Sequence, residues 1–107
     1  MKICVPITED GTVDPRWGRA QRVAIADVVG GEVRDWREIE VGWDAQHDQG
    51  AEGAHHARIV RFLRDNAVEA IAVGHVGPGM HRMLETMQIA IVADLTGDAR
   101  LAVATLG

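Results

Sequence analysis

The chain has 107 residues, of which 47% are hydrophobic and 25% are charged, and its formal net charge is -5 at pH 7. This length predicts a single domain over residues 1–107, because it suffices for one buried core but not for two. The negative charge disfavours a general nucleic-acid-binding protein, since affinity for duplexes is built from Lys and Arg. No apolar run of about 18 residues and no secretion signal is visible, so we expect a cytoplasmic protein with no membrane span.

The only cysteine, Cys4, excludes an internal disulfide and every metal motif that needs two cysteines of one chain. It lies in an apolar stretch, where it is most simply a small buried side chain. A metal bound by this chain would therefore depend mainly on other ligands.

The first half of the chain has the pattern of β-strands. Alternating or continuous apolar residues predict three of them, at 2–7, 23–29 and 32–41, the last two joined by a tight turn at Gly30 and Gly31. Pro15 and Gly18 indicate an irregular loop over 13–20, ordered by Trp17. The polar segment 42–53 predicts a mobile loop that is long for a compact domain and is therefore expected to be functional.

Helices and strands alternate in the second half. Helices are predicted at 54–65, where His56, Ile59, Val60 and Leu63 share one face, from Gly77 with Met80, Met83, Leu84 and Met87 as its buried stripe, and from Thr96. Nearly continuous apolar runs at 68–73 and 89–93 predict buried parallel strands. Strands followed by alternating helices and strands predict an α/β domain with a mixed central sheet and helices packed on it.

Ligands of such open sheets bind beyond the carboxyl ends of the parallel strands. Residues 74–77, with His75 among glycines, follow one such strand, and Asp94 follows the other. Glycines let a ligand approach the backbone, and a helix that starts near Pro78 offers N–H groups to an anion. The alternative is that these glycines only permit a tight turn between strand and helix.

All five histidines lie between residues 47 and 82, a segment with as many acidic as basic residues. Neighbouring side chains of a helix point about 100° apart, so His55 and His56 do not easily bind one small ion, and no His-x-x-x-His pair exists. A compact zinc site is poorly supported. His56 on the apolar stripe is alternatively a core residue, and His81 alternatively pairs with Glu85 on the surface.

A neutral rim that bears histidines suits something larger and more polarizable than one ion. A metal sulfide cluster needs few direct protein ligands and gains from imidazoles and from N–H or Arg donors to its sulfides. Weak ligation also suits a carrier that must release its cargo.

Four segments follow one another along the chain: the opening MKICVPI, VDPRWGRA at 13–20, IVRFLRDNAVEAIAVGHVGPGM at 59–80 and MQIAIVADLTGDA at 87–99. Together they resemble the dinitrogenase iron-molybdenum cofactor biosynthesis family. The resemblance covers almost the whole chain in the same order. It implies a three-layer ribonuclease H-like α/β fold and a nitrogenase accessory factor without catalytic turnover, which binds or carries the iron-molybdenum cofactor, its precursors or related sulfide clusters.

Two departures from the family pattern bear on the ligands. The usual His-Phe-Gly-Arg reads Arg16-Trp17-Gly18-Arg19, which removes a histidine and adds a cation. The usual Gly-Gly-x-Gly reads Gly74-His75-Val76-Gly77, which adds a histidine at the expected pocket. Ligation is therefore expected to have moved.

We expect a metallocluster carrier whose cargo contains molybdenum and iron, or molybdenum and copper, with sulfide. The residues expected to ligate its metals are His47, His55, His56, His75 and His81, and those expected to bind the rest of the cluster are Arg19, Gly74, Gly77 and Gly79. Its partners would be proteins that donate and accept the cluster, and the chain itself would be a monomer or a weak homodimer.

Two other functions remain open. A metal-dependent nuclease would need convergent carboxylates, for which Asp14, Asp27 and Asp94 are the candidates. A binding module for a phosphorylated small molecule or a partner protein would use the glycine turn and an exposed Trp36 or Trp43.

Overall fold

The structure is a computed structural model that describes residues 1–46 and 52–106. Its elements in chain order are β1 (Lys2–Ile7), the 3-10 helix η1 (Trp17–Arg19), β2 (Arg22–Val29), β3 (Glu32–Glu40), α1 (Trp43–Gln46), α2 (Glu52–Asp65), β4 (Ala70–Ala72), α3 (Pro78–Thr86), β5 (Ala90–Val92) and α4 (Ala99–Ala104). None of these helices is long and apolar enough to cross a membrane.

The five strands form one mixed sheet in the order β3-β2-β1-β4-β5. β1, β2 and β3 are antiparallel neighbours, whereas β4 is parallel to β1 and β5 is parallel to β4. The Gly30-Gly31 turn between β2 and β3 has a positive φ at both residues, a backbone conformation that glycine adopts without strain. The predicted α/β class and the mixed sheet are confirmed.

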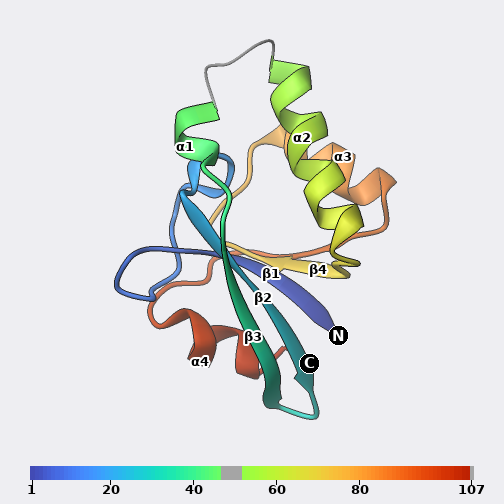
Figure 1. Cartoon of the computed structure of the whole chain (residues 1–107). Coiled ribbons are helices and arrows are strands. Elements are labelled where there is room, and N and C mark those ends of the chain that lie inside the picture. The colour runs from blue at the N-terminus through green and yellow to red at the C-terminus, as the bar shows by residue number, and fades with distance from the viewer. Residues whose placement is uncertain (47–51, 107) are drawn as a thin grey trace.

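Helices cover both faces of the sheet, which makes three layers (Figure 1). Side chains alternate across β1, so that Cys4 packs with residues of α2 and α3, whereas Ile3 and Val5 pack with residues of α4. β1 and β4 are thus buried on both faces, and for β4 this confirms the prediction from its apolar run.

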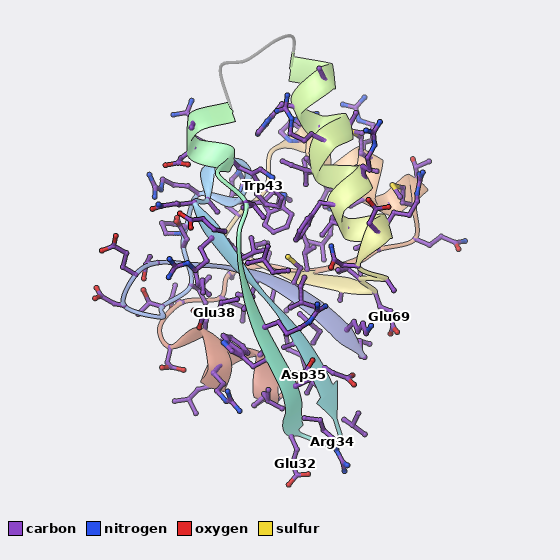
Figure 2. All side chains as sticks on the ribbon, in the orientation of Figure 1. Glu32, Arg34, Asp35, Glu38, Trp43 and Glu69 are labelled. Atoms are coloured by element: carbon purple, nitrogen blue, oxygen red, sulfur yellow. The ribbon has the colours of Figure 1, made fainter. Side chains whose placement is uncertain are left out.

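Three sequence predictions are wrong in detail. Segment 42–53 is not one loop, because α1 and the start of α2 occupy its two ends. Trp43 is not exposed: its side chain is 2% exposed and packs edge-on against Phe62 of α2 (Figure 2). The last strand, β5, is an edge strand whose residues are exposed or half-buried instead of fully buried.

Candidate functional site

A cavity of about 650 Å³ lies where the loop after β4 meets the η1 segment and the first turns of α2. It is lined by residues 15–19, 55–56 and 75–80. These three segments are far apart in the sequence and come together only in the folded chain. The predicted pocket beyond the carboxyl end of the central parallel strand is therefore confirmed.

The loop after β4 is fixed by backbone contacts. The Asp94 N–H donates to the Gly74 carbonyl, and the Leu95 N–H donates to the Val73 carbonyl, each at 3.0 Å. A Cβ added at Gly74 would lie 3.6 Å from both the Leu95 carbonyl oxygen and the Pro15 Cα. Gly74 therefore allows two loops to approach each other and is not among the residues that line the cavity.

The start of α3 forms one wall of the cavity. Gly77 is the N-cap in an extended conformation, without a hydrogen bond from a side chain, and Pro78 occupies the first turn. The first intrahelical bond runs from the His81 N–H to the Gly77 carbonyl at 3.0 Å. The N–H groups before it, at Gly79 and Met80, have no intrahelical acceptor, which is the arrangement that favours an anion.

The loop before η1 is held by a buried carboxylate. Asp14, whose side chain is 3% exposed, accepts hydrogen bonds from the Arg16 backbone N–H at 2.9 Å and from its Nε and Nη2 at 3.1 Å. The hydrogen bond and charge of Asp14 raise the pKa of the Arg16 guanidinium above its ordinary value. The charge of Arg16 is thus partly balanced, whereas Arg19 is exposed and has no ion-pair partner among the side chains of residues 1–45 and 54–106.

Aromatic side chains form the inner wall. Trp17 is 3% exposed and packs edge-on against Trp43, with ring centroids 5.2 Å apart. Its Nε1 is buried and has no hydrogen-bond partner in the described parts of the chain. A buried N–H without an acceptor destabilises the folded state by roughly 1–3 kcal/mol, and native proteins contain few such groups.

His55 joins two walls of the cavity. Its Nε2 lies 2.8 Å from the Gly18 carbonyl oxygen, and its Nδ1 lies 2.9 Å from Nη1 of Arg58. Because a guanidinium only donates, Nδ1 accepts and Nε2 carries the proton that it donates to Gly18. The imidazole therefore connects α2 to the η1 segment, with both of its nitrogens engaged in hydrogen bonds and neither left for a metal.

The buried histidine of α2 is not the one that the apolar pattern of the sequence predicted. The buried residue is His55, which is 4% exposed, whereas His56 is half-buried. The boundaries of the apolar stripe do not distinguish these two neighbours, because the loop that covers His55 comes from a distant part of the sequence.

His56 and His75 face the same cavity from different elements. His56 lies against the start of α3, since a Cβ added at Gly79 would be 3.3 Å from its Cε1. His75 is exposed in the loop after β4. The structure therefore brings His55, His56 and His75 to one cavity together with the predicted Arg19, Gly77 and Gly79.

The other two predicted histidines do not join this group in the described structure. His81 does not line the cavity, and its Nδ1 lies 2.6 Å from Oε1 of Glu85, which is the surface pair considered as its alternative. His47 lies outside the described residues. Sequence reasoning also missed Arg16, Trp17 and Met80 as lining residues, although the first two belong to the RWGR segment that departs from the family pattern.

The electrostatics of the cavity favour anions. No carboxylate is among the described residues that line it, although the chain as a whole is acidic. Arg16, Arg19 and the start of α3 supply positive potential, and the imidazoles supply nitrogen ligands. The described residues contain no group of three or more His, Cys, Asp or Glu placed to hold a metal ion, so they form no compact metal centre.

The three carboxylates considered for nuclease chemistry do not converge. The Asp14 N–H bonds to Pro6 near the end of β1, whereas Asp27 pairs with Lys2 at its start, about 13 Å away at 3.3 Å per residue. Asp94 is exposed beyond β5, on the other side of the sheet order from β2.

Solved structures with the same fold support the topology. The match with a crystal structure of PH0822 covers 98% of this chain and 86% of the PH0822 chain, with a TM-score of 0.77 and 16% identity. The match with the apo form of the orange protein (ORP) from Desulfovibrio gigas covers 94% of this chain and 80% of the orange protein, with a TM-score of 0.72 and 23% identity. A third match is with TM1290, a Thermotoga protein described as a candidate NifB protein of the DUF35 family. It covers 96% of this chain and 82% of TM1290, with a TM-score of 0.67 and 20% identity.

No curated protein sequence matches the chain significantly. The sequence profile of the dinitrogenase iron-molybdenum cofactor family, in contrast, matches residues 1–106. This match covers all but the last residue, and it includes each segment that forms the cavity. The chain therefore belongs to the dinitrogenase iron-molybdenum cofactor family.

Proposed function

We propose that this protein binds and carries an anionic sulfide cluster of molybdenum with iron, or of molybdenum with copper, during metallocluster assembly, without catalytic turnover. The observation that carries this proposal is the cavity at residues 15–19, 55–56 and 75–80, which combines imidazoles with cationic groups and has no carboxylate among its described lining residues. Membership of the iron-molybdenum cofactor family supports a cargo that contains iron and molybdenum.

The donor set fits a cluster better than a bare ion. Cys4, the only thiol, is buried in β1, and desolvation raises its pKa, so it supplies no thiolate. A cluster that brings its own sulfide does not need protein thiolates. It needs a few nitrogen ligands and hydrogen-bond donors to its sulfides, which the cavity offers.

The residues have distinct roles in this proposal. His75 and His56 coordinate the cluster, because they face the cavity from separate elements. Arg16, Arg19 and the N–H groups at the start of α3 balance its negative charge. His55 positions the η1 segment, and His47 remains a candidate ligand from the sequence.

The test is reconstitution of the purified chain under anaerobic conditions with tetrathiomolybdate and either Cu(I) or Fe(II). We expect a stoichiometric chromophore with charge-transfer absorption, and molybdenum that stays with the protein on desalting. His75→Ala is expected to weaken binding at least about tenfold. His81→Ala is the matched control, because His81 is exposed and does not line the cavity.

Two results would contradict this function. One is the absence of a stoichiometric chromophore in the wild-type chain. The other is an equal loss of binding in His75→Ala and His81→Ala, which would separate binding from the cavity.

A phosphate-binding module is the second candidate, favoured by the start of α3 and by Arg19 at the same cavity. Thermal shift with inorganic phosphate, nucleotides and sugar phosphates distinguishes it, since a ligand of the folded state stabilises by mass action. Stabilisation by these compounds that persists in His75→Ala would favour the phosphate module over the cluster carrier.

We also propose that the protein works in the cytoplasm. Its partners there are the proteins that donate and accept the cluster. We further propose that residues 1–107 form one domain with a ribonuclease H-like fold, an assignment supported by three antiparallel strands that continue into two parallel strands between layers of helices.

A further inference from the structure

The strand β3 lies at the edge of the sheet, with β2 on one side and no strand on the other among the described residues (Figure 1). It is the longest strand, at nine residues, and most of its side chains are exposed. An edge of this kind presents unpaired N–H and C=O groups to other chains. Figure 2 shows the charged side chains of Glu32, Arg34, Asp35 and Glu38 along it.

The charges of β3 are self-complementary in one antiparallel register. A two-fold axis beside Trp36 places Asp35 opposite the partner's Arg37 and Arg34 opposite the partner's Glu38. The same axis sets Glu32 opposite the partner's Glu40, a like-charge pair that lies beyond the register shift of β3. Axes beside Asp35 or Arg37 give no pair and one pair of opposite charges, respectively. Parallel in-register stacking would place every charge against its own copy, which opposes fibril-like assembly.

The side chains of each cross-strand pair lie on the same face of the sheet. Trp36 is on the α4 face, where the Arg100 guanidinium lies 5.6 Å from its ring centroid. Arg34 lines a groove with Arg100 on that face, and Glu38 accepts a hydrogen bond from the Trp36 Nε1 at 2.9 Å. Asp35 and Arg37 project from the other face, since they flank Trp36 in the strand.

The charges that would pair between copies are available. Arg37 and Asp35 are 51% and 64% exposed and lie 3.8 Å apart, whereas Arg34 and Glu32 are 61% and 74% exposed and lie 3.7 Å apart. Such exposed pairs contribute at most about 1 kcal/mol each, so they compete weakly with pairs formed across an interface.

We infer that β3 is a self-association edge, through which two copies of this chain pair antiparallel about Trp36 and join their sheets. The two Trp36 rings then become neighbours at the axis, as an aromatic cross-strand pair. The register shift opposite Asp27 and Val28 bends the strand near Arg34 and limits the flat segment. The dimer is consequently small and weak, and it does not depend on the cavity or its cargo.

The test uses charge reversal and mixing, measured by sedimentation velocity over a range of protein concentrations at low salt. Asp35→Arg gives two positive residues at positions 35 and 37, and Arg37→Asp gives two negative ones. By symmetry each variant replaces two attractive pairs by two repulsive ones, so we expect its dimer dissociation constant to rise about tenfold or more. An equimolar mixture of the two variants is expected to form a heterodimer.

The mixture keeps the test independent of folding defects, because a damaged strand would not recover by mixing. Asp65→Arg, an exposed substitution at the end of α2, has the same charge change as Asp35→Arg and is the control; it is expected to dimerise like the wild type. A wild-type chain that stays monomeric up to about millimolar concentration, or single variants that dimerise as well as wild type, overturns the inference.

Discussion

Nη1 of Arg58 lies 2.9 Å from Nδ1 of His55, so that the other nitrogen of this buried imidazole donates to the Gly18 carbonyl. His55→Ala removes both bonds, leaves a buried carbonyl without its donor and opens a void. We expect the free energy of unfolding to fall by about 2–4 kcal/mol. Urea unfolding followed by tryptophan fluorescence measures this change, since Trp17 lies in the segment that His55 holds.

The control is the same substitution at His81, which is exposed and paired only on the surface. His81→Ala is expected to change stability by less than about 1 kcal/mol. Equal effects of the two substitutions would show that His55 does not connect α2 to the η1 segment.

Because Nε1 of Trp17 has no hydrogen-bond partner among the described residues, we expect position 17 to tolerate the loss of the indole N–H. Trp17→Phe loses packing volume but also removes a buried N–H that has no acceptor in the described structure. We expect it to be less destabilising than Trp43→Phe by about 1 kcal/mol, because both changes remove similar volume from the same aromatic cluster. Thermal unfolding of the two variants compares them, and a larger loss for Trp17→Phe would imply that its N–H is satisfied in solution.

Gly79 provides a test of the cavity that leaves the fold intact. A Cβ at this position would lie 3.3 Å from Cε1 of His56, which is tighter than an ordinary contact and would displace the imidazole by a few tenths of an ångström. We expect Gly79→Ala to weaken binding of tetrathiomolybdate with Cu(I) several-fold and to change stability by less than about 1 kcal/mol. Anaerobic titration of the chromophore measures the affinity.

Gly77→Ala is the matched control for this substitution. A Cβ at Gly77 meets no atom within 4 Å, and its φ of -70° suits any residue. The control is expected to retain most of the affinity, with a small loss of stability at the N-cap. If the two alanine variants bound equally well, His56 would not be a ligand.

The position of the cavity could be predicted from the sequence because it follows from strand order. The apolar run before Gly74 and the helix start at Pro78 are local signals, and the carboxyl end of a parallel strand is where their loop must open. The wall formed by residues 15–19 could not be predicted in the same way. Trp17 is placed by its packing against Trp43, a contact between segments with no shared periodicity.

The choice among histidines needed the tertiary structure as well. His55 and His56 are neighbours, and the sequence pattern of α2 does not decide which of them faces a loop 37 residues earlier in the chain. The surface position of His81 could be predicted from the sequence, since Glu85 four residues later offers it a local partner on the same helix. The surroundings of His55 and His56, which depend on long-range packing, could thus not be predicted from the sequence, whereas the place of His75 beside the cavity at the strand end could.

Cys4 predicts how stability depends on pH. Burial in β1 raises the pKa of its thiol above the ordinary value of 9.0, so the folded protein keeps the proton while the unfolded chain releases it. The stabilising contribution of the neutral thiol is complete below about pH 9 and is lost as the pH rises beyond it, by about 1.4 kcal/mol per pH unit. Cys4→Ala is expected to be less stable at pH 7, but its free energy of unfolding is expected to fall less steeply between pH 9 and 11.

Because the chain has no tyrosine and one lysine, few other groups titrate in this range. Denaturant unfolding of both proteins across this pH range measures the difference in slope, and parallel declines would mean that the thiol ionises in the folded state.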